Sequence, residues 1–257
     1  MRESITAWIV NYIQENSIKD KPVTTWQSPL VAIASANDPL FSELQTIVTL
    51  DHLLPTDLLA GAQSVITYFL PFSRAINLSN LHNRESSAEW ATAYIETNKL
   101  ISSVNNHISQ QLAELGYRAA VVPPTHNFDK ETLISHWSHK HVAYIAGLGT
   151  FGINHLLITA KGCNGRLGSL VTDMVMQASP RPSFEYCLSK YNGSCGSCRE
   201  RCPQDVLASQ EYDRQRCYAL CLENAAKHQS IGLADVCGKC ASQVPCSFIA
   251  PAAARVK

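Results

Sequence analysis

Cysteines concentrate in the last quarter of the chain, and their spacing is typical of iron–sulfur chemistry. Nine of the ten cysteines in this 257-residue sequence lie between residues 187 and 246. Several are separated by only two or three residues, so short turning loops can present their sulfurs to one point. Cys202-Pro203 follows Cys198 as at the end of the bacterial ferredoxin run, where the last cysteine ligates the other cluster. The pattern predicts two [4Fe–4S] clusters held by eight thiolates.

The cysteines divide between two sites in a crossed arrangement. We expect the first cluster to take Cys187, Cys195, Cys198 and Cys246, and the second to take Cys202, Cys217, Cys237 and Cys240. Cys187 is the weakest of these assignments, because its gap to Cys195 is longer than usual. Cys221 is the alternative, since a helix would place it on one face with Cys217. Cys163, far upstream, is expected to be a small buried hydrophobic residue.

Disulfides and structural zinc are the alternative readings of these cysteines. A disulfide framework suits small secreted domains, whereas the sequence beginning MRESITAWIV shows no secretory signal. Zinc would explain four paired cysteines but neither the Cys202-Pro203 step nor the surplus. The CxxxCxxC order of radical enzymes is absent from the sequence. Thiolate clusters without a secretory signal predict a cytoplasmic protein.

Composition predicts a globular protein with one large or two modest domains. Apolar residues make up 46%, and 21 basic residues balance 21 acidic ones, so no global charge attracts nucleic acid or membrane. No apolar run approaches the length of a membrane span. Pro180-Arg181-Pro182 marks the expected boundary between an α+β domain, residues 1–180, and a ferredoxin-like domain, residues 181–257.

Apolar periodicity and breaker residues predict interleaved helices and strands in the first domain. The expected helices cover residues 3–17, a long stretch that starts with a capping box at 86–89 and ends at Gly116, and residues 130–146. The expected strands cover residues 30–34, 64–70, 117–122, 154–159 and 167–176. The last two resemble a hairpin around a turn at 162–165. These elements predict an α+β fold with a mixed sheet and flanking helices.

Residues 147–152 read Gly-Leu-Gly-Thr-Phe-Gly, the literal GxGxxG string of dinucleotide sites. The fingerprint needs a strand before it, a helix after it and an acidic residue about twenty positions on. Here a helical pattern precedes and a strand pattern follows, which disfavours nicotinamide binding. The glycines then allow either close approach to another flat cofactor or a tight turn. Just upstream, His136 and His139 would share a helical face, as metal ligands or as ordinary hydrogen-bonded histidines.

Several stretches together resemble the epoxyqueuosine reductase family. The resemblance rests on Pro55-x2-Leu58-Leu59-x-Gly61, on Leu70-Pro71, on the glycine stretch followed by Asn154, and on the doubled cysteine blocks. It covers roughly residues 50–246. It implies a nitroreductase-like α+β domain that binds cobalamin base-off, beside a two-cluster ferredoxin-like domain, as in the related reductive dehalogenases. It also implies that Gly147, Gly149, Gly152 and Asn154 face the corrinoid.

The sequence departs from that family in two places. The family's aspartate shortly before the glycine stretch falls at Leu133-Ile134-Ser135, where no aspartate stands, and Ser135 or His136 is a candidate replacement. The C-terminal helical repeats of long members, which help to hold tRNA, are absent, so tRNA is not expected to be held as it is there. The sequence identifies neither the electron donor nor the substrate, which is a small molecule or a group of another kind.

Two functions therefore stand at this point. One is a corrinoid-dependent iron–sulfur reductase, fed by an external electron donor, in which a protein acid supplies a proton. The other is an electron-transfer or corrinoid-handling protein with no turnover of its own. The missing aspartate favours the second, and a large α+β domain around a glycine loop favours the first.

Overall fold

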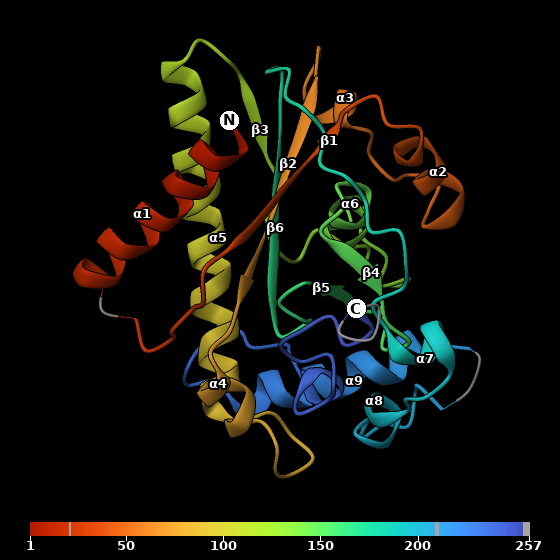
Figure 1. The fold of residues 1–257 in the computed structure, drawn as a ribbon. Helices are drawn as coiled ribbons and strands as arrows, with labels where there is room; N and C mark the ends of the chain where they lie inside the picture. Colours follow the sequence, from red (N-terminus) through yellow and green to blue (C-terminus); the bar gives the residue numbers. More distant parts are fainter. Residues whose placement is uncertain (21, 209–210, 254–257) are drawn as a thin grey trace.

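Four strands form one sheet at the centre of the computed structural model, which describes residues 1–20, 22–208 and 211–253 (Figure 1). Their order is β1 (Leu30–Ser35), β2 (Ser64–Pro71), β6 (Gly165–Thr172) and β3 (Ala119–Val121). All three pairings within this sheet are antiparallel. The α+β class is thus confirmed, but the expectation of a mixed sheet is wrong for this sheet. Helices lie between β1 and β2 in the sequence, but the chain leaves β1 and enters β2 at the same end of the sheet. The two strands are therefore antiparallel.

Helices cover both faces of the sheet and leave the central strand buried along its whole length (Figure 1). Side chains alternate along β2. Ile66 packs in the cluster that includes α1 (Arg2–Asp20) and α5 (Ala88–Glu114). Val65 packs in the cluster that includes α2 (Leu40–Ile47) and α6 (His139–Ile145). A strand covered on both faces reads as a continuous apolar run, as residues 64–70 do.

The long helix α5 confirms the predicted stretch, with its start shifted by one residue. Its cap is Ser87, whose Oγ accepts a hydrogen bond from Trp90 N at 3.1 Å, and not Ser86. Gly116 follows the end of α5 with φ +84°, a conformation that favours glycine. The helix therefore presents a fixed apolar face to β6 and a fixed N-terminal end to the cysteine segment.

The helix predicted for residues 130–146 is mostly wrong, because only α6 forms. Residues before it make a loop that is held by local polar contacts. Asp129 Oδ1 accepts from Thr132 N at 2.7 Å, and Ser135 Oγ donates to Trp137 O at 2.8 Å. Asp and Ser side chains that bind nearby backbone compete with helix formation.

The predicted hairpin is also wrong in its pairing. The strand β5 (Leu157–Thr159) pairs with β4 (Gly149–Phe151), while β6 joins β2 and β3 in the main sheet. The pair β4–β5 lies beside α6, next to the cysteine segment (Figure 1). A strand's partner is chosen by tertiary packing, which the alternation of apolar residues does not encode.

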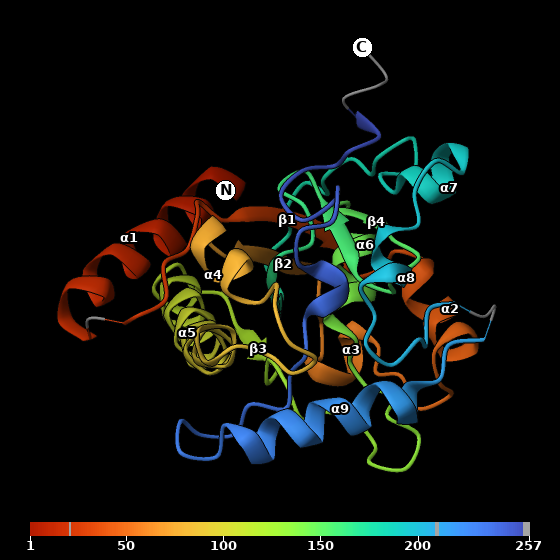
Figure 2. The same cartoon turned by 90° about the horizontal axis from the view of Figure 1, so that it is seen from below.

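The cysteine-rich segment lies across one end of the sheet, beneath α5 and the short helix α4 (Arg74–Ser79) (Figures 1 and 2). Its elements are α7 (Leu188–Asn192), α8 (Ser197–Glu200), α9 (Arg214–Lys227) and the 3-10 turn η1 (Lys239–Ala241). The small helix α3 (Pro55–Leu58) belongs to the β1–β2 connection. The domain boundary predicted at residues 180 and 181 stays a prediction.

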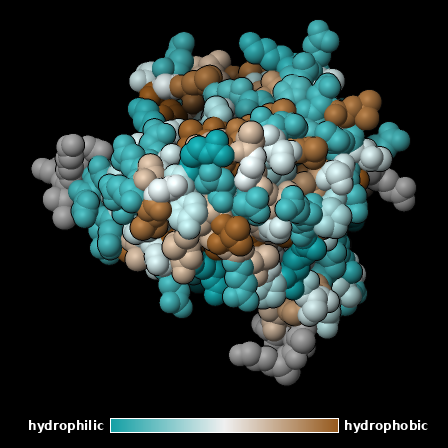
Figure 3. Space-filling view, turned by 90° about the horizontal axis from the view of Figure 1, so that it is seen from above, coloured by the Kyte–Doolittle hydropathy of each residue, from teal (hydrophilic) through white to brown (hydrophobic). Residues whose placement is uncertain are grey.

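The face at the opposite end of the sheet is mainly hydrophilic, with apolar side chains in small separate groups (Figure 3). Large apolar residues exposed on the surface of the protein include Leu50 and Val175. Scattered apolar residues of this kind are normal for a folded protein. Within the part of the chain that the structure describes, no helix combines the length and apolarity needed to cross a bilayer.

Candidate functional site

Four cysteines from separate parts of the segment line one cavity. They are Cys187, Cys195, Cys198 and Cys246, the set predicted for the first cluster. Burial, together with the charges of the three other cysteines, raises the pKa of Cys198 to about 12. The helices α7 and α8 bring the first three together, and the loop after η1 brings Cys246.

The other five cysteines of the segment form a second group that adjoins the first, since Cys202, Cys217 and Cys240 pack in one cluster with Cys198 and Cys246. Burial, together with the charges of Cys217 and Cys202, raises the pKa of Cys237 to about 11. Burial also raises the pKa of Cys240, with further contributions from Cys237, Cys217, Cys198 and Cys202. Cys221 is close to Cys217 and Cys237, whose charges raise its pKa after burial. The structure therefore places Cys221 beside the second group, and Cys221 does not line the cavity of the first group.

The helix α9 positions two cysteines of the second group. Asp213 caps this helix, because its Oδ1 accepts a hydrogen bond from Arg216 N at 2.9 Å. Cys217 and Cys221 then follow at i and i+4 on the helix, as the sequence predicted. Gly238 precedes η1 with φ +72°, and a Cβ there would lie 2.1 Å from the Trp90 ring. Only glycine allows Cys237 and Cys240 this close to α5.

The chemistry of these two donor sets suits iron–sulfur clusters. A thiol with a pKa near 11 or 12 stays protonated at neutral pH. A bound cationic metal reverses that balance, because a coordinating thiol is deprotonated outright. Among the residues that the structure describes, no three His, Cys, Asp or Glu side chains converge closely enough to hold a metal ion. The cysteines are grouped, but their sulfurs are not drawn together around a centre.

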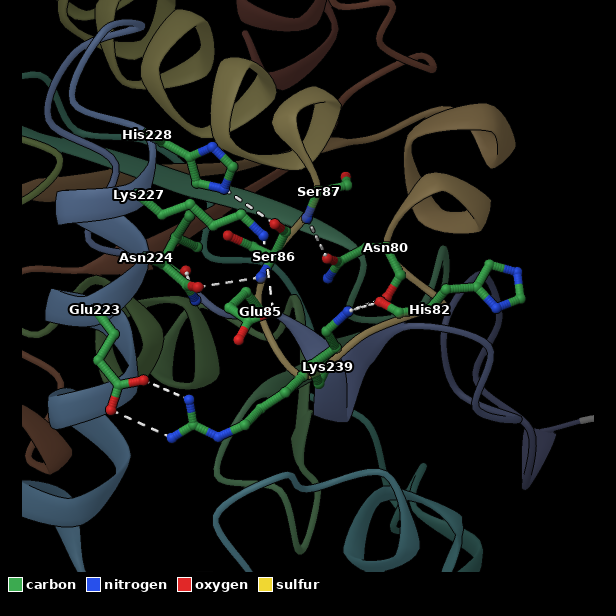
Figure 4. A network of polar contacts seen from close by, with 12 residues as sticks. Asn80, His82, Glu85, Ser86, Ser87, Glu223, Asn224, Lys227, His228 and Lys239 are labelled. Carbon is green, nitrogen blue, oxygen red and sulfur yellow. Dashed lines mark hydrogen bonds and ion pairs between the residues drawn. The ribbon is translucent and has the colours of Figure 1, made fainter.

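A buried lysine ties the second group to the α4–α5 connection (Figure 4). Lys239 stands between Cys237 and Cys240 and is 2% exposed. Its Nζ donates to Asn80 O at 2.9 Å and to His82 O at 2.7 Å. Burial lowers the pKa of Lys239, and Cys237 in its ionised form acts in the opposite direction. A buried cation needs compensation, and a negatively charged cluster would provide it.

The same connection is fixed to α9 by further polar contacts (Figure 4). Asn224 Oδ1 accepts from Ser86 N at 3.2 Å, and its Nδ2 donates to Val236 O at 2.8 Å. His228 Nε2 lies 2.9 Å from Ser86 O. These contacts join residues 86, 224 and 236, which lie on three separate segments, so the second cysteine group is built on a rigid frame.

The glycine loop packs tightly against protein. A Cβ on Gly149 would lie 1.9 Å from Ile158 O in the paired strand, and one on Gly147 would lie 2.5 Å from Pro180 O. A Cβ on Gly152 would lie 2.5 Å from the side chain of Asn154. The glycines therefore serve the turn from α6 into β4 and the close β4–β5 pairing. That Gly147, Gly149, Gly152 and Asn154 face a corrinoid stays a prediction.

Asn154 connects this loop to the cysteines. It is 5% exposed, and its Nδ2 donates to Cys240 O at 3.2 Å. Gly152 and Asn154 also line the cavity of the first cysteine group. The predicted cofactor loop therefore borders the first cysteine group.

Four polar side chains meet beside the second group, and sequence reasoning missed them. Tyr94 Oη donates to Asp235 Oδ1 at 2.7 Å, and His126 Nε2 lies 3.0 Å from Asp235 Oδ2. The Arg166 guanidinium lies over the Tyr94 ring at 4.4 Å, and its buried Nε has no hydrogen-bond partner among the residues that the structure describes. Burial raises the pKa of Tyr94 to about 12, so its phenol holds a proton at neutral pH. We call Tyr94, His126, Arg166 and Asp235 the polar niche.

Nothing in the sequence could have identified the polar niche directly. Its members come from α5, the loop before α6, strand β6 and the stretch between Cys221 and Cys237. No spacing links them, and Asp235 carries no motif. The one available hint was the unusual position of Arg166 at the start of a buried strand.

The residues proposed as replacements for the missing aspartate are placed differently from each other. Ser135 Oγ donates to Asn127 Oδ1 at 3.0 Å and to Trp137 O, so it braces the loop. His136 is exposed and precedes α6, so it does not share a helical face with His139. The loop residue that reaches a buried carboxylate is His126.

His139 is an ordinary buried, hydrogen-bonded histidine. Trp137 Nε1 donates to Ser169 Oγ at 3.0 Å, and Ser169 Oγ lies 2.8 Å from His139 Nδ1. His139 Nε2 lies 2.9 Å from Pro123 O, which can only accept. The network therefore assigns the proton to Nε2 and the accepting role to Nδ1. Burial lowers the pKa of His139 to about 4, which keeps the ring neutral.

Solved structures with this fold include epoxyqueuosine reductases and reductive dehalogenases. An epoxyqueuosine reductase from Bacillus subtilis is 15% identical, with a TM-score of 0.52, over 92% of this chain and 65% of that chain. An epoxyqueuosine reductase solved with an epoxyqueuosine-modified tRNA-Tyr stem loop is 17% identical, with a TM-score of 0.51, over 84% and 58%. A reductive dehalogenase whose structure suggests a mechanism for B12-dependent dehalogenation is 15% identical, with a TM-score of 0.54, over 84% and 29%.

These likenesses confirm the predicted resemblance at the level of the fold. The chain spans less than two thirds of the B. subtilis reductase and less than a third of the dehalogenase. No protein-family model and no curated protein matches it. Activity, substrate and cofactors are therefore matters for proposal.

Proposed function

We propose that this chain is an iron–sulfur oxidoreductase of the epoxyqueuosine reductase type, with two [4Fe–4S] clusters and a base-off corrinoid as electron acceptor. One observation carries the proposal. Nine cysteines spread over sixty residues of sequence fold into two neighbouring groups, one of which borders the glycine loop and the other the polar niche. A protein that binds only a structural metal would not need its cysteine groups to lie between a cavity and buried ionisable side chains.

The proposed division of labour follows the residues. Cys187, Cys195, Cys198 and Cys246 would hold one cluster, and Cys202, Cys217, Cys237 and Cys240 the other. Bound clusters supply one-electron transfer. The α+β part, residues 1–180, shapes the substrate side, and residues 181–257 carry electrons from an external donor. Because such thiolates persist in a reducing compartment, the proposal places the protein in the cytoplasm.

The polar niche would supply charge and a proton to the substrate. Tyr94 holds a proton at neutral pH and is oriented by Asp235. Arg166 offers an unpaired N–H donor beside it. Such a pair can bind an electron-rich group and protonate a developing negative charge.

The corrinoid part of the proposal rests on the likeness of the fold. The glycines add no support to it, because protein atoms occupy the positions that a Cβ on Gly147, Gly149 or Gly152 would take. The proposal does not include tRNA binding, because the chain spans 58% of the reductase that was solved with the tRNA stem loop.

A second candidate function is a two-cluster electron-transfer or corrinoid-handling protein without turnover. The closed packing around the glycine loop favours it. Titration of the anaerobic protein with cobalamin and with NADH separates the candidates. The main proposal predicts cobalamin uptake with a base-off visible spectrum and no NADH binding. Binding of neither would leave the electron-transfer function, and tight NADH binding alone would refute both.

A further inference from the structure

Cys163 lies against Cys246, a proposed ligand of the first cluster. The two Sγ atoms are 3.9 Å apart, within reach of an S–H···S hydrogen bond. Cys163 is 83 residues from its partner and 6% exposed. Cys163 was predicted to be a small buried hydrophobic residue, which describes its burial but not its contact with Cys246.

The backbone fixes this contact. Cys163 N donates to Cys246 O at 2.9 Å, and Asn164 N donates to Ser247 O at 3.1 Å. A Cβ on the preceding Gly162 would lie 2.4 Å from Phe248 N, so the two segments touch along their main chains. The position of the Cys163 thiol therefore depends on a paired backbone.

The roles of the two sulfurs follow from the proposed ligation. The Sγ atoms lie 3.9 Å apart, and a thiolate that ligates a cluster carries no proton. With Cys246 as a ligand, only the Cys163 thiol can donate in this contact.

We propose that Cys163 is a positioning residue that donates an S–H hydrogen bond to the Cys246 thiolate and thereby raises the reduction potential of the first cluster. The inference rests on the proposed function. Reduction adds negative charge to the cluster, and a donor to a ligating sulfur stabilises the more negative state. Burial of Cys163 strengthens the effect, because its thiol is largely shielded from water.

The lining of the first cavity separates this role from ligation. Cys187, Cys195, Cys198 and Cys246 all line that cavity, and Cys163 is not among the residues that line it. Four thiolates complete a cluster of this kind. Cys163 therefore approaches Cys246 from outside the ligand set.

The test compares the unaltered chain with Cys163→Ala and Cys163→Ser, all prepared anaerobically. Iron and sulfide are counted, the fold is checked by circular dichroism, and both clusters are titrated potentiometrically with detection by electron paramagnetic resonance. We expect both variants to retain the full iron content. Cys163→Ala should lower the midpoint potential of one cluster only, and Cys163→Ser, which keeps a donor, should have a potential above that of the alanine variant. Cys221→Ala, which removes a thiol outside the first group, should leave the same cluster unchanged.

Loss of about half the iron in Cys163→Ala would make Cys163 a ligand and overturn the inference. Full iron with both potentials unchanged in Cys163→Ala would overturn it as well. Absence of iron and sulfide from the unaltered chain would overturn the proposed function, and this inference with it.

Discussion

The phenol of Tyr94 donates a 2.7 Å hydrogen bond to Asp235, which lies 141 residues further along the chain. Tyr94 stands on α5, and Asp235 lies between Cys221 and Cys237. The bond therefore joins the helix that packs on the sheet to the segment that carries the second cysteine group. Because His126 and Tyr218 also contact the Asp235 carboxylate, one side chain couples the stability of both parts.

Removal of the Asp235 carboxylate should be costly. We expect Asp235→Ala to lower the free energy of unfolding by about 3 kcal/mol, because it leaves buried donors and the Arg166 charge without compensation. Tyr94→Phe removes one hydrogen bond and should cost about 1 kcal/mol. Denaturant unfolding measures both values, with the exposed Asp51→Ala as the matched control. A cost for Asp235→Ala no larger than that of Asp51→Ala would contradict the coupling.

Gly149→Ala should destabilise the fold whether or not a cofactor is bound. The added Cβ would meet Ile158 O at 1.9 Å and separate β4 from β5. We expect a loss of at least about 3 kcal/mol, since backbone on both sides must shift. Gly116→Ala, where φ is +84° and nothing lies within 4 Å, isolates the cost of strain alone. That control should lose about 1 to 2 kcal/mol. Equal thermal stability of the two variants would refute the role assigned to the loop.

Stability should fall as the pH is lowered from 6.5 towards 4. The pKa of His139 is about 4 in the folded protein and about 6.5 when exposed, so the unfolded chain binds a proton first in this window. Protonation would also break the bond in which Nδ1 accepts from Ser169. The contribution is about 3 kcal/mol at most. His139→Gln should reduce the pH dependence of unfolding between these limits. An unchanged slope would show that His139 does not carry it.

The cysteine groups predict different losses of iron for different variants. Cys187→Ala and Cys202→Ser should each lose about half the iron, from different clusters, while Cys221→Ala should keep all of it. Spectra of the remaining cluster identify which site was lost. Full iron in Cys187→Ala, together with half the iron in Cys221→Ala, would exchange their roles. Loss of the same cluster in Cys187→Ala and Cys202→Ser would contradict the crossed arrangement.

The sequence predicted those parts of the molecule that local patterns decide. Buried strands β1 and β2 were predictable, because apolar runs end at breakers such as Pro71. The grouping of Cys195 with Cys198 followed from their spacing. Residues 130–138 were not predictable as a loop, since side chains of Asp129 and Ser135 bind the backbone in place of helical bonds.

Contacts over long sequence separations could not be predicted. The antiparallel order of the sheet depends on the pairing of β2 with β6, about a hundred residues apart. The polar niche and the contact between Cys163 and Cys246 depend on the same kind of tertiary folding. The glycine string suggested a cofactor surface, because glycines that serve close packing and glycines that serve a ligand look alike in sequence.

Iron and acid-labile sulfide in the anaerobically prepared chain test the central proposal most directly. Two clusters predict about eight iron and about eight sulfide per chain, with broad visible absorption that bleaches on reduction. Zinc at comparable stoichiometry, without sulfide, would contradict the proposal and identify the cysteine groups as structural metal sites.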